Sequence, residues 1–275
     1  MKNAESPIGI FDSGIGGLTV ANAVLNTLPK ESFIYFGDTA HLPYGDKSPE
    51  TIRRYSTVIT DFLLHNEVKL IIIACNSASS VAYEHVQELA ASKNVKVVNV
   101  IDPVVEYIVQ NNIKNVGIIG TRATIGSQIF PQKIETNQPL INVATLATPL
   151  LAPMIESGFV KGDISKAVIE NYLTDPVLEN IEALVLACTH YPLIKKEIAQ
   201  FYQENNRAVE ILATNEIVAQ YVKKILNEEN LISTSKHVIH RFFVSDYTDS
   251  FEETTKLFYK KEVVLQHSPI FEGDS

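Results

Sequence analysis

The sequence predicts an α/β protein with two similar lobes, each built on a mainly parallel sheet. Short apolar runs rich in Ile and Val are typical of strands that are buried on both faces of a sheet. These runs alternate with segments whose apolar residues recur at helical spacing, and this alternation indicates parallel strands joined by right-handed crossovers. The pattern begins again near the middle of the chain, which indicates two related lobes.

The first hundred residues contain several predicted strands separated by helices. The predicted strands are Ile8–Phe11, Phe33–Phe36, Leu70–Ala74 and Val95–Ile101. A helix is predicted from Leu18 to Leu28, because the proline that follows cannot continue it. Ser48 followed by Pro49 is typical of a helix start, with the serine as N-cap.

The second half of the chain repeats this pattern. The run Val116–Thr121 is similar to Ile8–Ser13, and the distance along the chain between these runs is close to that between Cys75 and Cys188. Many α/β chains show loose self-similarity, so a chance resemblance is the alternative. We predict a duplication, with a pseudo-two-fold axis that brings the two cysteine loops face to face across an active-site cleft.

The carboxyl-terminal region predicts how the chain is divided between the lobes. Its strand-like runs and its helix have no counterpart in the middle of the chain; they are Val238–Val244, Asp249–Tyr259 and Val263–Leu265. We therefore expect this region to return and complete the first lobe. The expected lobes are residues 1–100 together with 213–275, and residues 101–212.

Composition and charge restrict the functional classes. The chain has 275 residues, 45% of them hydrophobic, and a mean hydropathy of +0.06, which indicates an ordinary globular protein. A net charge of −9 gives little support to nucleic-acid binding through phosphate contacts. No signal peptide and no membrane-spanning run is visible, so we expect a cytoplasmic protein with reduced thiols and no disulfide.

The two cysteines of the chain occupy the same kind of position. Cys75 follows the predicted strand Leu70–Ala74, Cys188 follows the run Ala183–Ala187, and each precedes polar residues that can begin a helix. Open α/β sheets bind ligands at the carboxyl ends of their strands. A helix N-terminus favours the thiolate, so we expect the pKa of Cys75 to be lowered. The alternative role of a free cysteine is that of a small buried hydrophobe.

Other polar residues are predicted at the same edge of the first sheet. Asp12 and Ser13 end the first strand, while Tyr44 and Gly45 follow the second. A carboxylate at Asp12 would lie beside the reacting centre. Glu156, judged from its spacing alone, is a solvated residue near a helix end.

A pair of thiols in matched settings suits a reaction that is its own mirror image. Racemisation needs a base on one face of a carbon and an acid on the other, and these two groups exchange roles when the direction reverses. Thiol and thiolate interconvert near neutral pH, which is the range that general acid–base catalysis requires. No lysine lies in a recognisable pyridoxal phosphate setting, so we expect a site that needs no cofactor.

Three alternatives stay open at this point. His190, two residues after Cys188, would suit a Cys–His amidase, although an amidase needs only one of the cysteines. The two cysteines and His190 could bind zinc, but the chain offers no Cys-x-x-Cys pair and no fourth ligand. A non-catalytic amino-acid-binding module is the third. Nucleotide binding is disfavoured, because Gly14–Gly17 lacks the glycine spacing of a dinucleotide site.

Four stretches together closely resemble the glutamate racemases of the cofactor-independent aspartate/glutamate racemase superfamily. They are Phe11–Val20, Gly37–Gly45, Ala74–Ser79 and Ala187–Leu193, and the similarity extends over essentially the whole chain. The resemblance implies two α/β lobes with the site between them, often as a homodimer. It implies interconversion of L- and D-glutamate without a cofactor or a metal, which supplies D-glutamate for peptidoglycan in a bacterial cytoplasm.

The resemblance also implies roles for individual residues. Cys75 would remove the proton from D-glutamate, and Cys188 would remove it from L-glutamate. Asp12 and His190 would assist, and Glu156 would act on the Cys188 side. The residues expected to hold the substrate are Asp12, Ser13, Tyr44, Gly45, Asn76, Ser77, Thr121, Thr189 and His190.

The chain departs from the family pattern at two places. Ser77 stands where members commonly carry threonine, so the hydroxyl is kept and a methyl group is lost. The stretch Ala213–Glu216 lacks the Asp-Ser pair that members often have there. Aspartate is the nearest alternative substrate, because one methylene separates it from glutamate and contributes only a modest energy.

Overall fold

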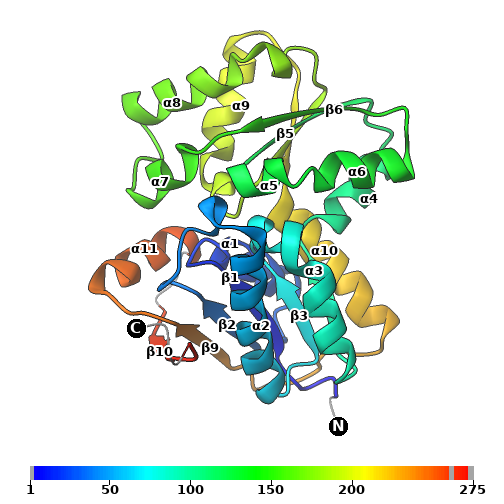
Figure 1. Cartoon of the computed structure of the whole chain (residues 1–275), viewed down its shortest axis with the longest axis vertical. Coiled ribbons are helices and arrows are strands. Elements are labelled where there is room, and N and C mark those ends of the chain that lie inside the picture. Colours follow the sequence, from blue (N-terminus) through cyan, green and yellow to red (C-terminus); the bar gives the residue numbers. More distant parts are fainter. Residues whose placement is uncertain (1–2, 260–262, 272–275) are drawn as a thin grey trace.

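The computed structural model describes residues 3–259 and 263–271, which form two lobes, each containing a parallel sheet (Figure 1). One lobe combines the blue and cyan N-terminal segments with the orange and red C-terminal ones, while green segments from the middle of the chain lie in the other. The predicted α/β class with two similar lobes is confirmed.

The first sheet contains strands from both ends of the chain. They are β1 (Ile8–Asp12), β2 (Phe33–Gly37), β3 (Leu70–Ile73), β4 (Lys96–Asn99), β9 (His240–Val244) and β10 (Leu265–His267). Their order is β10-β9-β2-β1-β3-β4, and every neighbouring pair is parallel. The two C-terminal strands therefore extend the first sheet beyond β2.

The second sheet contains only strands from the middle of the chain. They are β5 (Asn115–Gly120), β6 (Asn142–Ala147), β7 (Ala183–Ala187) and β8 (Glu210–Ala213). Their order is β6-β5-β7-β8, again with parallel pairs throughout. Every residue of β1, β2, β3 and β7 is buried, as expected for parallel strands covered on both faces.

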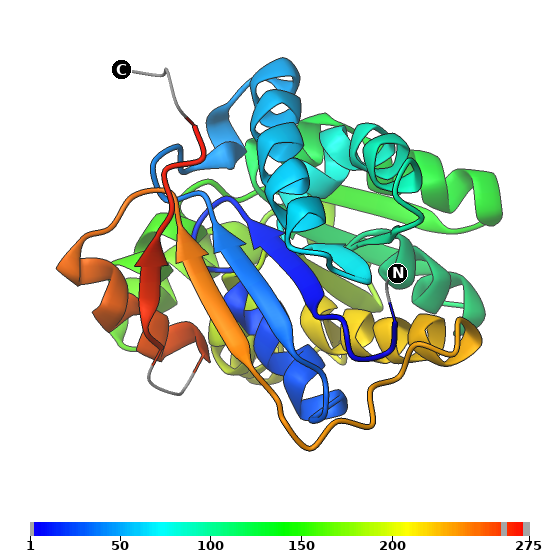
Figure 2. The ribbon, with the colours of Figure 1, turned by 90° about the horizontal axis from the view of Figure 1, so that it is seen from below.

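Helices cover both faces of the first sheet (Figure 2). The α-helices are α1 (Leu18–Thr27), α2 (Pro49–His65), α3 (Asn76–Ala91), α4 (Asp102–Gln110), α5 (Arg122–Gly126), α6 (Ile129–Asn137), α7 (Leu151–Glu156), α8 (Asp163–Leu173), α9 (Lys195–Glu204), α10 (Thr214–Glu228) and α11 (Asp249–Tyr259). The core on one face includes α2 and α3, and the core on the other includes α1, α10 and α11. None of the helices within the described residues is both long enough and apolar enough to cross a membrane.

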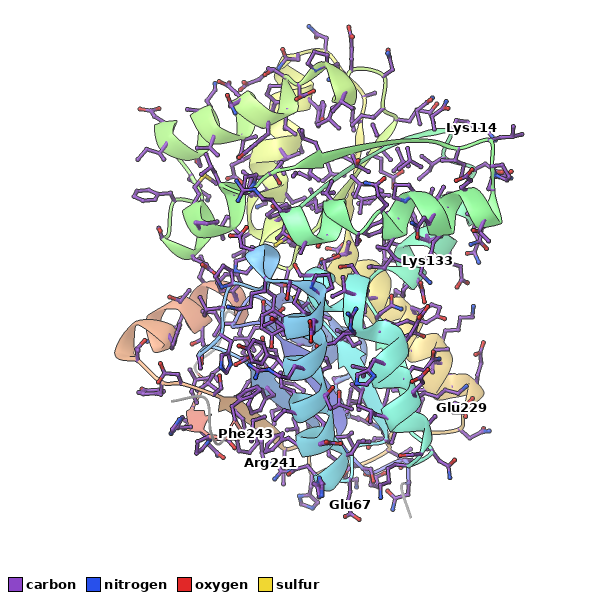
Figure 3. The ribbon with its side chains drawn as sticks, viewed as in Figure 1. Glu67, Lys114, Lys133, Glu229, Arg241 and Phe243 are labelled. Carbon is purple, nitrogen blue, oxygen red and sulfur yellow. The ribbon has the colours of Figure 1, made fainter. Side chains whose placement is uncertain are left out.

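Side chains from both lobes fill the junction between them (Figure 3). Lys133 of α6, labelled there, forms an ion pair within the second lobe, with Asp102 at the start of α4 and 2.8 Å between Nζ and Oδ1. Both side chains are about one-third exposed, so solvent screens this pair and its contribution to stability is small.

Several predicted boundaries are confirmed, and others shift by one or two residues. Ser48 caps α2 by accepting a hydrogen bond from the N–H of Thr51 at 3.3 Å. The strand predicted to run to Ile101 ends at Asn99, because the Asn99 side chain accepts from two following backbone N–H groups and turns the chain into α4. The last strand begins at Leu265 rather than Val263, since Leu265 is the first residue paired with β9.

Candidate active site

Polar side chains gather where the central strands of both sheets end. Asp12 is the last residue of β1, and Thr121 directly follows β5. Cys75 lies two residues after β3, and Cys188 directly follows β7. All four residues therefore lie at the carboxyl edge of a parallel sheet, where α/β proteins bind their ligands.

The thiol of the first lobe lies at the N-terminus of α3. Cys75 is 5% exposed; its sulfur accepts from the N–H of Ala78 at 3.4 Å and lies 3.6 Å from Ser13 Oγ. Burial and then the negative charge of Asp12 raise the pKa of Cys75 to about 12. The expectation of a lowered pKa for Cys75 is wrong, because these two effects outweigh the hydrogen bonds of the helix N-terminus.

The thiol of the second lobe has a histidine partner. Cys188 Sγ lies 3.6 Å from Nδ1 of His190, whose Nε2 lies 2.8 Å from Oε1 of Glu156. Burial lowers the pKa of His190, but the thiolate form of Cys188 and the Glu156 carboxylate more than offset this and raise it to about 10. The imidazole is therefore protonated at neutral pH. Glu156, at the end of α7, thus contacts the site although its side chain is 36% exposed.

Unpaired polar atoms are buried at the same place. Asp12 is 1% exposed, and its Oδ2 accepts from the N–H groups of Gly14 and Gly17 at 3.3 and 2.9 Å. The other carboxylate oxygen of Asp12, Oδ1, is buried without a hydrogen-bond partner among the described residues. The same holds for the amide Oδ1 and Nδ2 of Asn76. Leaving such atoms unpaired costs about 1–3 kcal/mol each, so these atoms are available to a polar ligand.

A buried carboxylate holds the loop after β2 in place through hydrogen bonds. Asp38 is fully buried and accepts hydrogen bonds from Tyr44 Oη at 2.5 Å and from Ser245 Oγ at 2.7 Å. The hydroxyl of Tyr44 is thus already engaged. Its neighbour Gly45 approaches the other lobe so closely that a Cβ atom there would lie 2.9 Å from Cβ of Thr121.

Hydrogen bonds and ring contacts join the two lobes around these residues. Ser77 Oγ lies 2.9 Å from Thr121 Oγ1. Thr19 Oγ1 donates to the carbonyl oxygen of Thr189 at 2.8 Å. The ring of His190 meets Phe258 edge-on, with 5.1 Å between ring centroids.

Two of these contacts involve residues that the sequence did not identify. Phe258 lies on α11, far along the chain from His190, and nothing near it in the sequence indicates a role in the site. Thr19 lies inside a stretch that resembles the family, but as an ordinary residue of a helix it carries no separate signal.

The described residues contain no cluster of three or more His, Cys, Asp or Glu side chains arranged to hold a metal ion. Both cysteines are free thiols. The fold and the site together define a class of protein: two-lobed α/β proteins in which each lobe places one thiol at the junction.

Comparison with known proteins identifies this class. The sequence model of the Asp/Glu/Hydantoin racemase family matches residues 16–222. A glutamate racemase of Geobacter metallireducens is 40% identical over 89% of this chain and 89% of its own length. The crystal structure of Francisella tularensis glutamate racemase in complex with D-glutamate is 38% identical, covers 98% of this chain and 99% of that one, and gives a TM-score of 0.91.

A further solved structure, Thermus thermophilus glutamate racemase in complex with beta-chloro-D-alanine, is 34% identical with a TM-score of 0.86, covering 97% of this chain and 98% of its own. The chain belongs to the Asp/Glu/Hydantoin racemase family.

Proposed function

We propose that this protein interconverts L- and D-glutamate by proton transfer between two thiols. The observation that carries the proposal is the matched placement of Cys75 and Cys188 after corresponding strands of the two sheets. Relatives named as glutamate racemases, at about 40% identity over most of the chain, support glutamate as the substrate.

The reaction needs a base and an acid on opposite faces of Cα. With L-glutamate, the thiolate of Cys188 removes the Cα proton, and the thiol of Cys75 gives its proton to the other face. With D-glutamate the two sulfurs exchange roles. In the L-to-D direction, the raised pKa of Cys75 favours the thiol that acts as the acid, while protonated His190 stabilises negative charge on Cys188.

The unpaired buried atoms are suited to hold an amino acid. The free oxygen of Asp12 can accept a hydrogen bond from the substrate ammonium group, and the Asn76 amide can donate to a carboxylate. The remaining binding residues that we propose are Ser13, Tyr44, Gly45, Ser77, Thr121, Thr189 and His190. Hydrogen bonds to the α-carboxylate stabilise the charge that develops when Cα loses its proton.

We also propose that the enzyme works in the cytoplasm as a homodimer and supplies D-glutamate for peptidoglycan. The family resemblance supports these three points. Sedimentation equilibrium of the purified chain would measure its oligomeric state.

The experiment is incubation of the enzyme with L- or D-glutamate in deuterated water. Racemisation should place deuterium on Cα of both isomers, and Cys75→Ala or Cys188→Ala should lower the rate of racemisation about 10³-fold. An amidase acting on glutamine would instead release ammonia and retain activity after loss of one thiol. Aspartate serves as the parallel substrate, and faster racemisation of aspartate than of glutamate would overturn the substrate assignment.

A further inference from the structure

Thr19 joins the two lobes at the loop that carries Cys188. It is the second residue of α1, 5% exposed, and its hydroxyl donates to the carbonyl of Thr189 in the other lobe at 2.8 Å. Thr189 is also 5% exposed, so this bond is shielded from water. The same hydroxyl lies 3.0 Å from the carbonyl of Gly16 in its own turn.

The local sequence of the loop explains why this carbonyl needs a donor from outside. The carbonyls of Cys188 and His190 each accept from the backbone N–H three residues further on, at 3.2 and 3.1 Å. The same pattern would pair Thr189 with residue 192, which is a proline and has no N–H. A buried carbonyl is normally paired, and the Thr19 hydroxyl is the donor that the structure shows for it.

The packing around Thr19 shows how closely the lobes meet here. A Cβ atom on Gly16 would lie 2.4 Å from Cε1 of His190 and 2.6 Å from Oγ1 of Thr189. The adjacent Gly17 donates its N–H to Asp12 at 2.9 Å. One turn of chain therefore fixes the Asp12 carboxylate in one lobe and touches the catalytic loop of the other.

We propose that Thr19 is a positioning residue that sets the place of the Cys188–His190 loop relative to Asp12. The inference rests on the proposed function, because it concerns how the two halves of that site are aligned. Thr19 itself does not contact the substrate. Its hydroxyl substitutes, across the lobe junction, for the backbone N–H that Pro192 lacks.

Four variants test the proposal. Thr19→Val keeps the shape and removes the donor, while Thr19→Ser keeps the donor. Thr60→Val is the matched control, because Thr60 is equally buried but donates within its own helix, to the carbonyl of Ser56 at 2.6 Å. The double variant Thr19→Val with Pro192→Ala gives the loop a backbone N–H of its own.

We expect Thr19→Val to lower kcat/KM for racemisation about tenfold, the usual effect of removing one partner of a buried hydrogen bond. The loss must be equal for both isomers, because the two isomers are equally stable. Thr19→Ser should stay within about threefold of the parent and the double variant should regain part of the loss, because each supplies a donor to the carbonyl. Thr60→Val should keep its kcat/KM.

A second measurement does not depend on activity. The titration of His190, followed by NMR and assigned with a His190→Asn variant, should have its midpoint near the pKa of about 10 in the parent. Thr19→Val should lower this midpoint, because a displaced loop moves the imidazole away from the Glu156 carboxylate on α7, which helps to raise its pKa. If the parent enzyme does not racemise glutamate, the proposed function fails, but this titration still tests Thr19.

The proposal is overturned if Thr19→Val retains full kcat/KM and an unchanged His190 midpoint. It is also overturned if Thr60→Val causes the same losses, since that would indicate a general effect of removing a buried hydroxyl. If Thr19→Val does not fold, Thr19→Ser decides it: a tenfold loss of kcat/KM in the serine variant would contradict the proposal.

Discussion

The two lobes share one topology but differ in the charges beside their thiols. The order β2-β1-β3-β4 in the first sheet corresponds to β6-β5-β7-β8 in the second. Ile8 pairs with Leu70 in the first lobe, and Val116 pairs with Ala183 at the corresponding place in the second. The duplication predicted from the sequence is therefore visible strand by strand.

This register matches each site residue with a counterpart in the other lobe. Asp12, at the end of β1, corresponds to Gly120 at the end of β5, so the second lobe has no carboxylate there. Ser77, two residues after Cys75, corresponds to His190, two residues after Cys188. Two substitutions at matched positions thus separate the halves: the first lobe has Asp12 and Ser77 where the second has Gly120 and His190.

The consequence is opposite electrostatics on a common scaffold. The thiol of Cys75 faces negative Asp12, and its pKa is raised to about 12, whereas Cys188 faces an imidazolium. A racemase needs symmetric geometry, because both faces of Cα must be reached, yet it needs opposite protonation of the two thiols at any moment. Duplication supplies the symmetric geometry, and the two substitutions supply the difference in charge that favours opposite protonation of the thiols.

The largest expected effect comes from removing one thiol. Cys75→Ala should lower racemisation about 10³-fold, because one acid–base group is lost. Cys188 can still remove and return a proton on its own face, so L-glutamate should exchange its Cα hydrogen for deuterium with retained configuration. NMR of the Cα signal combined with chiral chromatography measures both quantities.

The reciprocal variant completes this test. Cys188→Ala should exchange D-glutamate with retention and leave L-glutamate unlabelled. If each variant labels the opposite isomer, the assignment of the two thiols to the two faces is reversed.

A smaller effect is expected from neutralising the carboxylate of the first lobe. Asp12→Asn removes the negative charge that, after burial, raises the pKa of Cys75, so this pKa should fall. Modification of Cys75 by iodoacetamide, read by mass spectrometry, should begin at lower pH, with Cys188 in the same sample as internal reference. Racemisation should fall about 10²-fold through loss of a substrate contact. Exposed Asp61→Asn is the control, and an unchanged Cys75 profile would contradict the role of Asp12.

Glu156→Gln tests the charge balance of the second lobe. Burial lowers the pKa of His190 while Cys188 and Glu156 raise it, so the variant should bring it below its parent value of about 10. The alkaline limb of the kcat/KM profile should move to lower pH: if the pKa falls by one unit, the loss is about twofold at pH 9 and approaches tenfold near pH 11.

The stability of the folded protein should depend on pH in the direction that this raised pKa requires. A histidine whose folded pKa lies above its unfolded value of 6.5 contributes stability that is fully present below pH 6.5 and lost as the pH rises through about 10. Glu156→Gln should therefore lower the melting temperature at pH 6 and have little effect above pH 10. Exposed Glu135→Gln is the matched control, and a loss that is independent of pH would rule out this linkage.

The comparison also shows which features a sequence can reveal. Strands buried on both faces, such as β3 and β7, are continuous apolar runs and were predictable. The edge strand β6 was not, because its residues are half-buried or exposed and form no such run. Helix α8 was not predicted either, because it begins after Gly162 without a side-chain cap.

Some features of the site could likewise be predicted from the sequence and others could not. Residues at strand ends could be placed from the sequence, because parallel strands end at one edge of a sheet. The direction in which the pKa of Cys75 shifts could not be predicted from the sequence. The shift depends on burial and on Asp12, which lies on a different strand and far from Cys75 in the chain. The role of Phe258 could not be predicted either, because its contact with His190 arises only when α11 packs against α1.

The smallest expected effect concerns Ser77, the position that corresponds to His190. Ser77→Thr keeps the hydroxyl that lies 2.9 Å from Thr121 and adds one methyl group at a buried position. We expect kcat/KM to change by less than about threefold, because the bond between the lobes is kept. Ser77→Ala removes that bond and should cost about tenfold, again as kcat/KM measured with both isomers. Equal losses in the two variants would show that space rather than the hydroxyl matters here. The hydroxyl would then not be what joins the lobes on the Cys75 side.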